Sequence, residues 1–308
     1  MARKRKGNPV HGWVILDKSA GVGSTPMVGK VRYAFQAQKA GHGGTLDPFA
    51  TGLLPIALGE ATKTVSFVMD GEKSYRFTVR WGVETDSADI DGEVTATSEL
   101  RPTKAAIIAA LPQFIGDIEQ IPPIYSAIKI DGKRAYDLAR EGKPVEMKPR
   151  QVKIYDLRLI EIVDEDHAIF EVNCGKGTYV RTIGRDLAKQ LGTLGHLSAL
   201  RRTKVGPFTE KHAISLAELE EMEHNAAVAN VLQPIEAALD GIPALALSEE
   251  EAIRLRNGQA VSLLRKVDLD RIKGLKAEDV VVALFNGKAV ALANYAKAEI
   301  KPIRVLIQ

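Results

Sequence analysis

One aspartate stands out in this sequence because of the loop that surrounds it. Asp47 lies in the segment Gly41–Leu54, which has four glycines among its first twelve residues. Glycine permits positive φ angles and a close approach of the backbone to a ligand, and an ordinary helix or strand needs neither. Pro48 disfavours the right-handed helical region at Asp47, so its carboxylate is expected on a stiff, extended backbone. A carboxylate held in this way suits a nucleophile or a general base.

An Asp-Pro pair is also a common turn, in which the aspartate bonds its own backbone. The apolar side chains around Asp47 argue against a turn that only faces solvent. They are Leu46, Phe49, Leu53 and Leu54. We therefore predict a functional loop and keep the simple turn as the alternative.

The run from Gly41 to Pro55, G-H-G-G-T-L-D-P-F-A-T-G-L-L-P, resembles the signature of the bacterial TruB-type tRNA pseudouridine synthases. The resemblance implies that Asp47 is the carboxylate on which the reaction depends. That reaction breaks the bond between uracil N1 and the ribose, turns the base and rejoins the ribose to C5, so it needs no metal and no cofactor. The sequence leaves open whether Asp47 attacks the sugar, attacks the base or removes a ribose proton.

The same resemblance implies roles for residues far from this loop. Tyr75, in Lys73-Ser-Tyr-Arg-Phe, is expected to stack on a uracil that has been flipped out of folded RNA. Arg181, in Gly-Thr-Tyr-Val-Arg-Thr, is expected to pair with Asp47 and keep it ionised. Four further residues are expected to bind the substrate: Tyr179 and Leu200 as walls of the uracil pocket, His42 as a residue that holds or wedges the RNA, and Lys18 as a weaker candidate.

Each assignment competes with a structural explanation. Tyr75 would otherwise be the first core residue of a strand, and Arg181 a surface charge at the start of a helix. His42 would otherwise satisfy a hydrogen bond within its loop. Near Lys18, Ser19 and Gly23 stand where the family usually has Pro and Thr, so the shape of that loop is open.

Composition limits the class of protein. The chain has 308 residues and a single cysteine, Cys174, which excludes an internal disulfide framework and a cysteine-based zinc cluster. We expect no structural metal. No apolar run is long enough to span a bilayer, and the basic N-terminus lacks the apolar core of a signal peptide. A cytoplasmic protein with no membrane partner is therefore predicted.

The net charge of +3 is too small to identify a nucleic-acid binder, but its distribution is uneven. The stretch 124–153 has eight Lys and Arg against four Asp and Glu. It begins after Pro122-Pro123 and contains a helical pattern from Arg134 to Glu141. We predict that residues 124–148 form an insertion that grips RNA.

Periodicity indicates an α+β fold. The segments 75–83 and 167–174 alternate between apolar and polar residues and are predicted as strands, as is 153–163. Helices are expected to start at Thr25 as the N-cap and to run over 103–114 and up to Leu191. The mixture lacks a βαβ rhythm, which favours a mixed, mainly antiparallel sheet flanked by helices.

The composition changes near residue 242. We predict a catalytic domain over 1–242 and a small β-rich domain over 243–308, with a helix from Ser248 to Asn257 and a hairpin at Asn286-Gly287. By its position, this second domain is similar to the PUA-like appendage of the same family.

The leading hypothesis is an isomerase that makes pseudouridine in the T-loop of tRNA, at position 55, by acting as a monomer on the T-arm stem-loop. A protein of another class, an RNA-binding or RNA-folding protein that captures a flipped base without chemistry, would use the same basic segment and Tyr75. Asp47 argues against it, because an anion that faces an anionic polymer weakens binding. A guide-RNA-dependent relative that modifies ribosomal RNA is a third possibility, and the basic insertion argues against that one.

Overall fold

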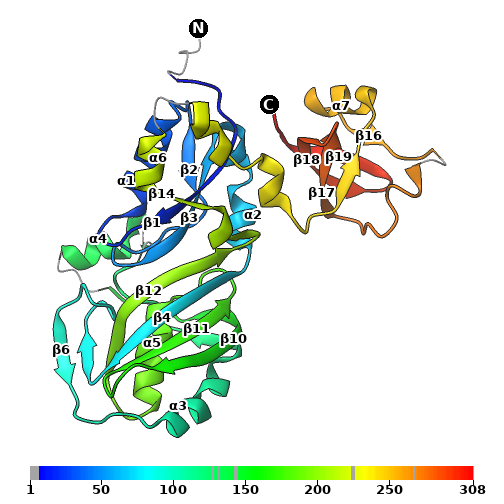
Figure 1. Ribbon diagram of the computed structural model, residues 1–308. Helices are drawn as coiled ribbons and strands as arrows, with labels where there is room; N and C mark the ends of the chain where they lie inside the picture. Colours follow the sequence, from blue (N-terminus) through cyan, green and yellow to red (C-terminus); the bar gives the residue numbers. More distant parts are fainter. Residues whose placement is uncertain are drawn as a thin grey trace.

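A ten-stranded mixed sheet is the main element of the protein (Figure 1). The structure, a computed structural model, describes residues 7–126, 128–130, 132–141, 145–222, 226–265 and 268–307. In spatial order the strands are β14 (Ala213–Ser215), β1 (Gly12–Lys18), β3 (Thr51–Leu58), β12 (Gly195–Val205), β4 (Lys73–Trp81), β11 (His167–Cys174), β10 (Arg150–Ile162) and β7 (Gly116–Gln120), with β2 (Ala40–His42) beside β3 and β13 (Phe208–Thr209) beside β12. The pairs β1–β14 and β3–β12 are parallel and the others are antiparallel. The predicted α+β class is confirmed.

Helices cover one face of this sheet. Met27 of α1, Ile107 of α3, Leu187 of α5 and Leu219 of α6 are buried in one apolar cluster with the strands. The helices are α1 (Ser24–Ala34), α3 (Lys104–Ala110), α5 (Val180–Gln190) and α6 (Leu216–Glu221). The helix predicted over 103–114 is α3, with Thr103 as its N-cap, followed by the 3₁₀ helix η2 (Leu111–Phe114). Because α5 lies across β12 and β4, its first turn is held at the edge of the cavity described below.

The start of α1 differs from the prediction. The N-cap is Gly23 and not Thr25, and no side chain caps this helix. Ser24 is already helical, and its buried hydroxyl bonds both the backbone N and O of Leu46, at 2.8 and 3.0 Å. The beginning of α1 therefore braces the loop that carries Asp47.

The strands β4 and β11 bury one face, as their alternation predicts. Phe77 and Phe170 are opposite each other in the register, and their rings stack with centroids 5.4 Å apart. Trp81 meets Phe170 edge-on at 6.1 Å. These contacts fix the register of β4, and so the position of Tyr75 at its active-site end.

The opposite face of the sheet is covered at β1 and β3 by a second layer. Trp13 and Leu53 lie on the face opposite the four helices named above. They pack in one buried cluster with Val282 and Leu292. The last two belong to a five-stranded sheet, β15 (Ala244–Ala246), β17 (Asp279–Phe285), β18 (Lys288–Ala296), β19 (Glu299–Val305) and β16 (Val261–Ser262) in spatial order, which lies to one side of the large sheet (Figure 1). The small β-rich C-terminal part is thus confirmed. The boundary predicted between residues 242 and 243 remains a prediction, because the two sheets share this cluster.

Two local predictions in the C-terminal part are confirmed. Ser248 caps α7 (Glu249–Arg256) in a capping box with Glu251. Asn286 and Gly287 both have positive φ, at 50° and 76°, and join β17 to β18. This is the conformation that an Asn-Gly hairpin turn requires.

The basic segment forms elements of its own. β8 (Lys129–Ile130) pairs only with β9 (Lys133–Arg134) in the described part of the chain, and α4 (Ala135–Arg140) follows. Lys143 lies outside the described residues. The remaining short elements are β5 (Val83–Thr85), β6 (Val94–Thr97), α2 (Val65–Asp70) and the 3₁₀ helices η1 (Gly59–Lys63), η3 (Glu210–His212), η4 (Ala226–Val231) and η5 (Ile235–Leu239).

Candidate active site

The loop that carries Asp47 connects β2 to β3 and is fixed from both sides. Leu46 and Phe49, next to the Asp-Pro pair, are buried in the main core. The carbonyl of Pro48 accepts hydrogen bonds from the Gly21 backbone N, at 2.8 Å, and from the Lys18 amine, at 3.1 Å. The turn interpretation of the motif is therefore insufficient, because the apolar neighbours anchor the loop and leave the carboxylate at its surface.

Arg181 and Asp47 meet as an ion pair. Arg181 Nε lies 2.9 Å from Asp47 Oδ2, but its N–H is not aligned on that oxygen, so the contact is a charge contact and not a hydrogen bond. The other guanidinium nitrogens are held elsewhere: Nη1 donates to Asp89 Oδ2 at 2.9 Å and to the Ser87 carbonyl, and Nη2 donates to the Tyr125 carbonyl at 2.8 Å. The pairing predicted between Arg181 and Asp47 is thus present in the geometry.

Burial and the nearby cations have opposite effects on the pKa of the Asp47 carboxyl. Its side chain is 33% exposed, and that exposed part faces a cavity. Burial of the rest raises the pKa of the Asp47 carboxyl above its ordinary value; Arg181 lowers it again and Asp89 raises it. The carboxylate is therefore less solvated than a surface aspartate and, as an ion, depends on the nearby cations.

A cavity of about 280 Å³ opens at this ion pair. Its lining combines one carboxylate, two arginines, two phenols and apolar groups. It includes Asp47, Tyr75, Tyr179, Arg181, Leu200 and Arg202. A concave site with an apolar surface and a few polar groups that point inward is the ordinary form of a small-ligand pocket. The structure thus brings together five of the seven residues singled out from the sequence.

The two tyrosines differ in their surroundings. Burial raises the pKa of the Tyr75 hydroxyl, and the nearby charge of Arg202 opposes that rise. Burial also raises the pKa of Tyr179, which is the N-cap residue of α5 and bonds the Gln120 side chain through its backbone N and O. Both hydroxyls are therefore protonated at neutral pH and available as hydrogen-bond donors.

His42 and Lys18 do not line this cavity. His42 Nδ1 accepts a bond from the Gly44 backbone N at 3.4 Å, and burial lowers the pKa of its ring. The Lys18 amine is buried and donates to the carbonyls of Ser19, Val22 and Pro48. Burial lowers the pKa of Lys18 to about 8. The geometry therefore gives these two residues a bracing contact with the loop, which is the structural alternative weighed for His42.

Two residues at the site were not predicted from the sequence. Asp89 is buried in the acidic turn after β5, where it accepts bonds from Ser87 Oγ and the Asp91 backbone N in addition to Arg181. Arg202 is 2% exposed and donates to three carbonyls of the Asp47 loop. A carboxylate in a turn and the second arginine of Leu-Arg-Arg have no periodic signal, so only the fold shows their contacts.

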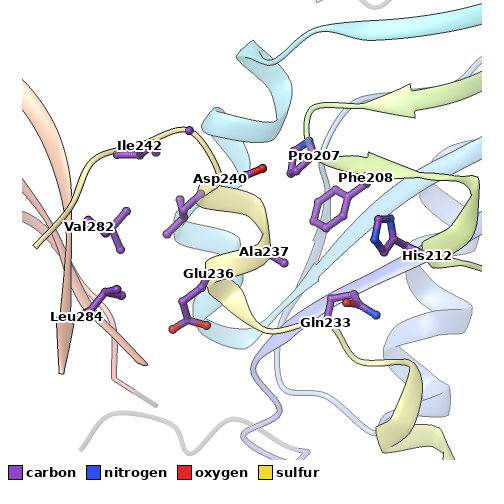
Figure 2. Close-up of a pocket in the computed structure, with 13 residues that line it drawn as sticks. Pro207, Phe208, His212, Gln233, Glu236, Ala237, Asp240, Ile242, Val282 and Leu284 are labelled. Carbon is purple, nitrogen blue, oxygen red and sulfur yellow. The ribbon is translucent and has the colours of Figure 1, made fainter. Parts of the chain in front are cut away.

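A larger cavity, of about 460 Å³, lies between the two sheets (Figure 2). Figure 2 shows Val282 and Leu284 of the small sheet on one side, Phe208 and His212 on the other, and the turn with Glu236 and Asp240 between them. It shares no lining residue with the cavity at Asp47. Among the described residues, its lining contains no lysine, arginine, tyrosine or cysteine, so we assign the chemistry to the smaller cavity.

No helix in the described part of the chain is long and apolar enough to cross a membrane. No group of three or more His, Cys, Asp or Glu side chains in those residues could hold a metal ion.

The fold and the site define a class of enzyme: an α+β protein in which a carboxylate, paired with a buried arginine, faces a cavity with tyrosine walls. The model of the TruB family pseudouridylate synthase N-terminal domain matches residues 32–180, and that of the tRNA pseudouridylate synthase B C-terminal domain matches residues 181–240. The chain belongs to the TruB family of pseudouridylate synthases. Pseudouridine synthases are isomerases, and the predicted enzyme class is confirmed.

Relatives extend this similarity over the whole chain. The tRNA pseudouridine synthase B of Caulobacter vibrioides is 52% identical over 306 residues and covers 99% of both chains. That of Bradyrhizobium diazoefficiens is 55% identical over 316 residues, which cover 99% of this chain and 90% of the relative. The predicted resemblance is thereby confirmed.

Solved structures show the same fold at lower identity. A chain in the structure of an H/ACA RNP bound to a substrate RNA containing 2'-deoxyuridine has a TM-score of 0.74 and 22% identity, over 100% of this chain and 92% of that one. A chain of a Cbf5-Nop10-Gar1 complex has a TM-score of 0.73 and 25% identity, over 96% and 85%. These likenesses support the fold assignment.

Proposed function

We propose that this protein converts uridine to pseudouridine in tRNA, in the T-loop and at position 55. The observation that carries the proposal is the Asp47 carboxylate at the wall of a cavity, 2.9 Å from the buried Arg181. Family membership supplies the reaction class, and the names of the relatives, tRNA pseudouridine synthase B, support tRNA as the substrate.

In the proposed reaction, Asp47 opens the glycosidic bond. The carboxylate attacks the ribose or the base, or removes a ribose proton, and each of these steps requires it to be ionised. The uracil then turns within the cavity and its C5 bonds to the ribose. Asp47 leaves the ribose or the base, or returns the ribose proton, and C5 loses the proton that N1 gains. Arg181 keeps Asp47 charged, because its guanidinium lowers the pKa of that carboxyl.

The remaining residues of the cavity bind the base. The Tyr75 ring is the stacking surface for a uridine that has left the RNA stack, and its hydroxyl assists the transfer of a proton. Tyr179 and Leu200 form the walls of the uracil pocket. His42 and Lys18 contribute through the loop, by the backbone contacts described above.

The basic segment binds the T-arm stem-loop. The exposed side chain of Lys133 lies on the β8–β9 hairpin and that of Lys148 follows α4. The carbonyl of Tyr125, near the start of the segment, bonds Arg181. A grip on the RNA backbone by this segment is thus adjacent to the catalytic ion pair. The charge of such a segment is suited to phosphate contacts.

Two further assignments complete the proposal. We propose that the enzyme acts as a monomer. It acts in the cytoplasm, in keeping with its single cysteine and the absence of a long apolar run from its sequence.

A protein that captures a flipped base without chemistry is the alternative. It would have no use for a carboxylate in the cavity, since an anion there repels RNA. A guide-RNA-dependent enzyme that modifies ribosomal RNA is the third possibility, but the relatives at 52–55% identity are named as tRNA enzymes.

The proposal is tested by mapping pseudouridine in bulk tRNA from cells that lack this protein. We expect loss of the modification at position 55, and its return with the wild-type gene but not with Asp47→Asn. Intact pseudouridine 55 in the deletion strain would contradict the proposed function. If the Asp47→Asn protein restored pseudouridine 55 in the deletion strain, this would contradict the role of the carboxylate and favour the protein that captures a base without chemistry.

A further inference from the structure

The strand β12 connects the two parts of the active site. On one side its Arg202 pairs in parallel register with Gly52 of β3, which follows the Asp47 loop. On the other side the same residue pairs in antiparallel register with Tyr75 of β4. A Cβ atom at Gly52 would lie 2.3 Å from the Arg202 carbonyl oxygen, so the two backbones are in close contact. Arg202 is therefore the residue at which the carboxylate loop and the tyrosine strand meet.

The Arg202 side chain holds the loop on both sides of Asp47. Its Nη2 and Nη1 donate to the carbonyls of Gly44 and Thr45, at 3.0 and 3.2 Å, and its Nε donates to the carbonyl of Leu53, at 2.8 Å. A guanidinium presents its donors in a rigid planar arrangement. Three carbonyls bonded to one such group cannot move independently, so the entry and exit of the loop are fixed relative to each other.

The same guanidinium lies beside Tyr75. Arg202 and Tyr75 are register partners, both line the cavity with Asp47, and the charge of Arg202 lowers the pKa of the phenol. Within the part of the chain that the structure describes, Arg202 forms no ion pair, and its charge acts on the Asp47 carboxyl by lowering the pKa. A buried cation without a carboxylate partner is costly to a fold. A role for the Arg202 charge in the reaction would explain why the fold keeps this buried cation.

The neighbouring Arg201 gives a matched comparison. It is one-third exposed and pairs with Asp17 at 2.8 Å and Glu210 at 2.7 Å. It does not line the cavity. Arg201 and Arg202 therefore have the same side chain on the same strand but different surroundings, and only Arg202 contacts the site.

We propose that Arg202 is a positioning residue of the reaction, which holds the backbone of the Asp47 loop rigid and keeps a fixed positive charge beside Tyr75, its partner in the register. This inference rests on the proposed function. The residue acts through Tyr75 and the loop, and it keeps the phenol and the carboxylate in register with a bound uridine. Since reacting groups must be aligned within a fraction of an ångström, loss of the arrangement should slow turnover more than binding.

The first test is a double-mutant cycle with single-turnover rates on a T-arm transcript. Arg202→Lys keeps the charge but cannot hold the three carbonyls in one plane, so its rate should fall about 10²-fold with KM changed less than threefold. If Arg202 acts through the hydroxyl, then Arg202→Lys combined with Tyr75→Phe should be little slower than the slower single variant. Arg201→Lys should keep the wild-type rate. Independent, multiplicative effects, or a wild-type rate in Arg202→Lys, would overturn the proposal.

The second test does not need turnover. The ¹³Cζ shift of Tyr75, assigned by comparison with Tyr75→Phe, reports ionisation of its hydroxyl during a pH titration. Because Arg202 lowers the pKa of Tyr75, Arg202→Gln should move this titration to higher pH, and Arg201→Gln should leave it unchanged. An unchanged titration in Arg202→Gln would overturn the proposal. An inactive wild-type protein that passes this test would contradict the proposed function alone.

Discussion

Arg181 holds Asp47 with one nitrogen and the protein with the other two. Its Nε is 2.9 Å from the Asp47 carboxylate, while Asp89 and the Tyr125 carbonyl bind the Nη atoms at 2.9 and 2.8 Å. The guanidinium is thus fixed before a substrate arrives. Asp47 gains a cation that does not need to move, which is how a preorganised site stabilises charge.

This relationship predicts a pH effect. Asp47 must be ionised, and Arg181 lowers the pKa of its carboxyl, so Arg181→Met should raise that pKa and move the acid limb of the kcat/KM profile to higher pH. The rate on the plateau should fall as well. The measurement is a pH–rate profile on a T-arm transcript, with Arg76→Met, which removes an exposed pair with Glu171, as the control. An acid limb that stays in place would show that Arg181 does not tune Asp47.

Tyr75 has a ring and a hydroxyl with separate proposed roles. Tyr75→Phe keeps the ring, so binding should be nearly normal while turnover falls. Tyr75→Leu should also lose stacking worth roughly 1–3 kcal/mol, seen as weaker binding of the T-arm. Tyr155→Leu is the control, because Tyr155 is a partly exposed tyrosine on β10 that does not line the cavity. Wild-type turnover in Tyr75→Phe would eliminate the role of the hydroxyl, and wild-type binding in Tyr75→Leu that of the ring.

Lys18 should make stability depend on pH. Burial lowers its pKa from 10.5 to about 8 in the folded protein, so between these values the unfolded chain binds a proton that the folded chain has released. The free energy of unfolding therefore rises with pH in this window, by at most roughly 3 kcal/mol. Urea denaturation at pH 8 and pH 10 should show the difference between wild type and Lys18→Met moving in favour of the wild type. A difference that does not change with pH would contradict the burial of a protonatable amine.

The basic segment should control the salt dependence of binding. Substituting the exposed Lys133 and Lys148 with Gln should weaken T-arm binding and flatten its dependence on salt, by about 0.7–0.9 in the logarithmic slope for each lost phosphate contact. Turnover of the bound RNA should persist. Lys104→Gln with Arg158→Gln changes two exposed charges outside the segment and serves as the control. Unchanged affinity and slope would exclude the segment as an RNA grip.

The sequence was most informative where a strand has one buried face. β4 and β11 alternate, because helices cover one side of them, and both were predicted. β3 was missed because the helices bury Leu54 and the C-terminal sheet buries Leu53, so no alternation remains. β12 was missed because charged residues occupy it and two irregularities interrupt its register. Its place between β3 and β4 is a long-range pairing that no local pattern encodes.

The site residues that could be predicted from the sequence are those that lie in a recognisable motif. Asp47, Tyr75 and Arg181 lie in distinctive motifs, and the structure brings all three to one cavity. The contacts of Asp89 and Arg202 depend on where distant turns and strands meet. The cap of α1 was predicted wrongly at Thr25 for a related reason, since Ser24 bonds Leu46, which is distant in sequence, and caps nothing.

The central claim, that the Asp47 carboxylate performs the chemistry, is tested most directly by Asp47→Asn. The substitution keeps the volume of the side chain and removes its charge. Because burial raises the pKa of the Asp47 carboxyl, the charge does not stabilise the folded protein, and its removal should leave the fold intact. Circular dichroism should show the wild-type fold, and T-arm binding should persist or tighten.

The deciding measurement is pseudouridine formed in a T-arm transcript by purified Asp47→Asn protein, with Asp164→Asn, an exposed aspartate in a turn, as the matched control. We expect the rate to fall by about 10⁴-fold or more in Asp47→Asn and to be unchanged in Asp164→Asn. A folded Asp47→Asn protein with activity within tenfold of the wild type would contradict the account.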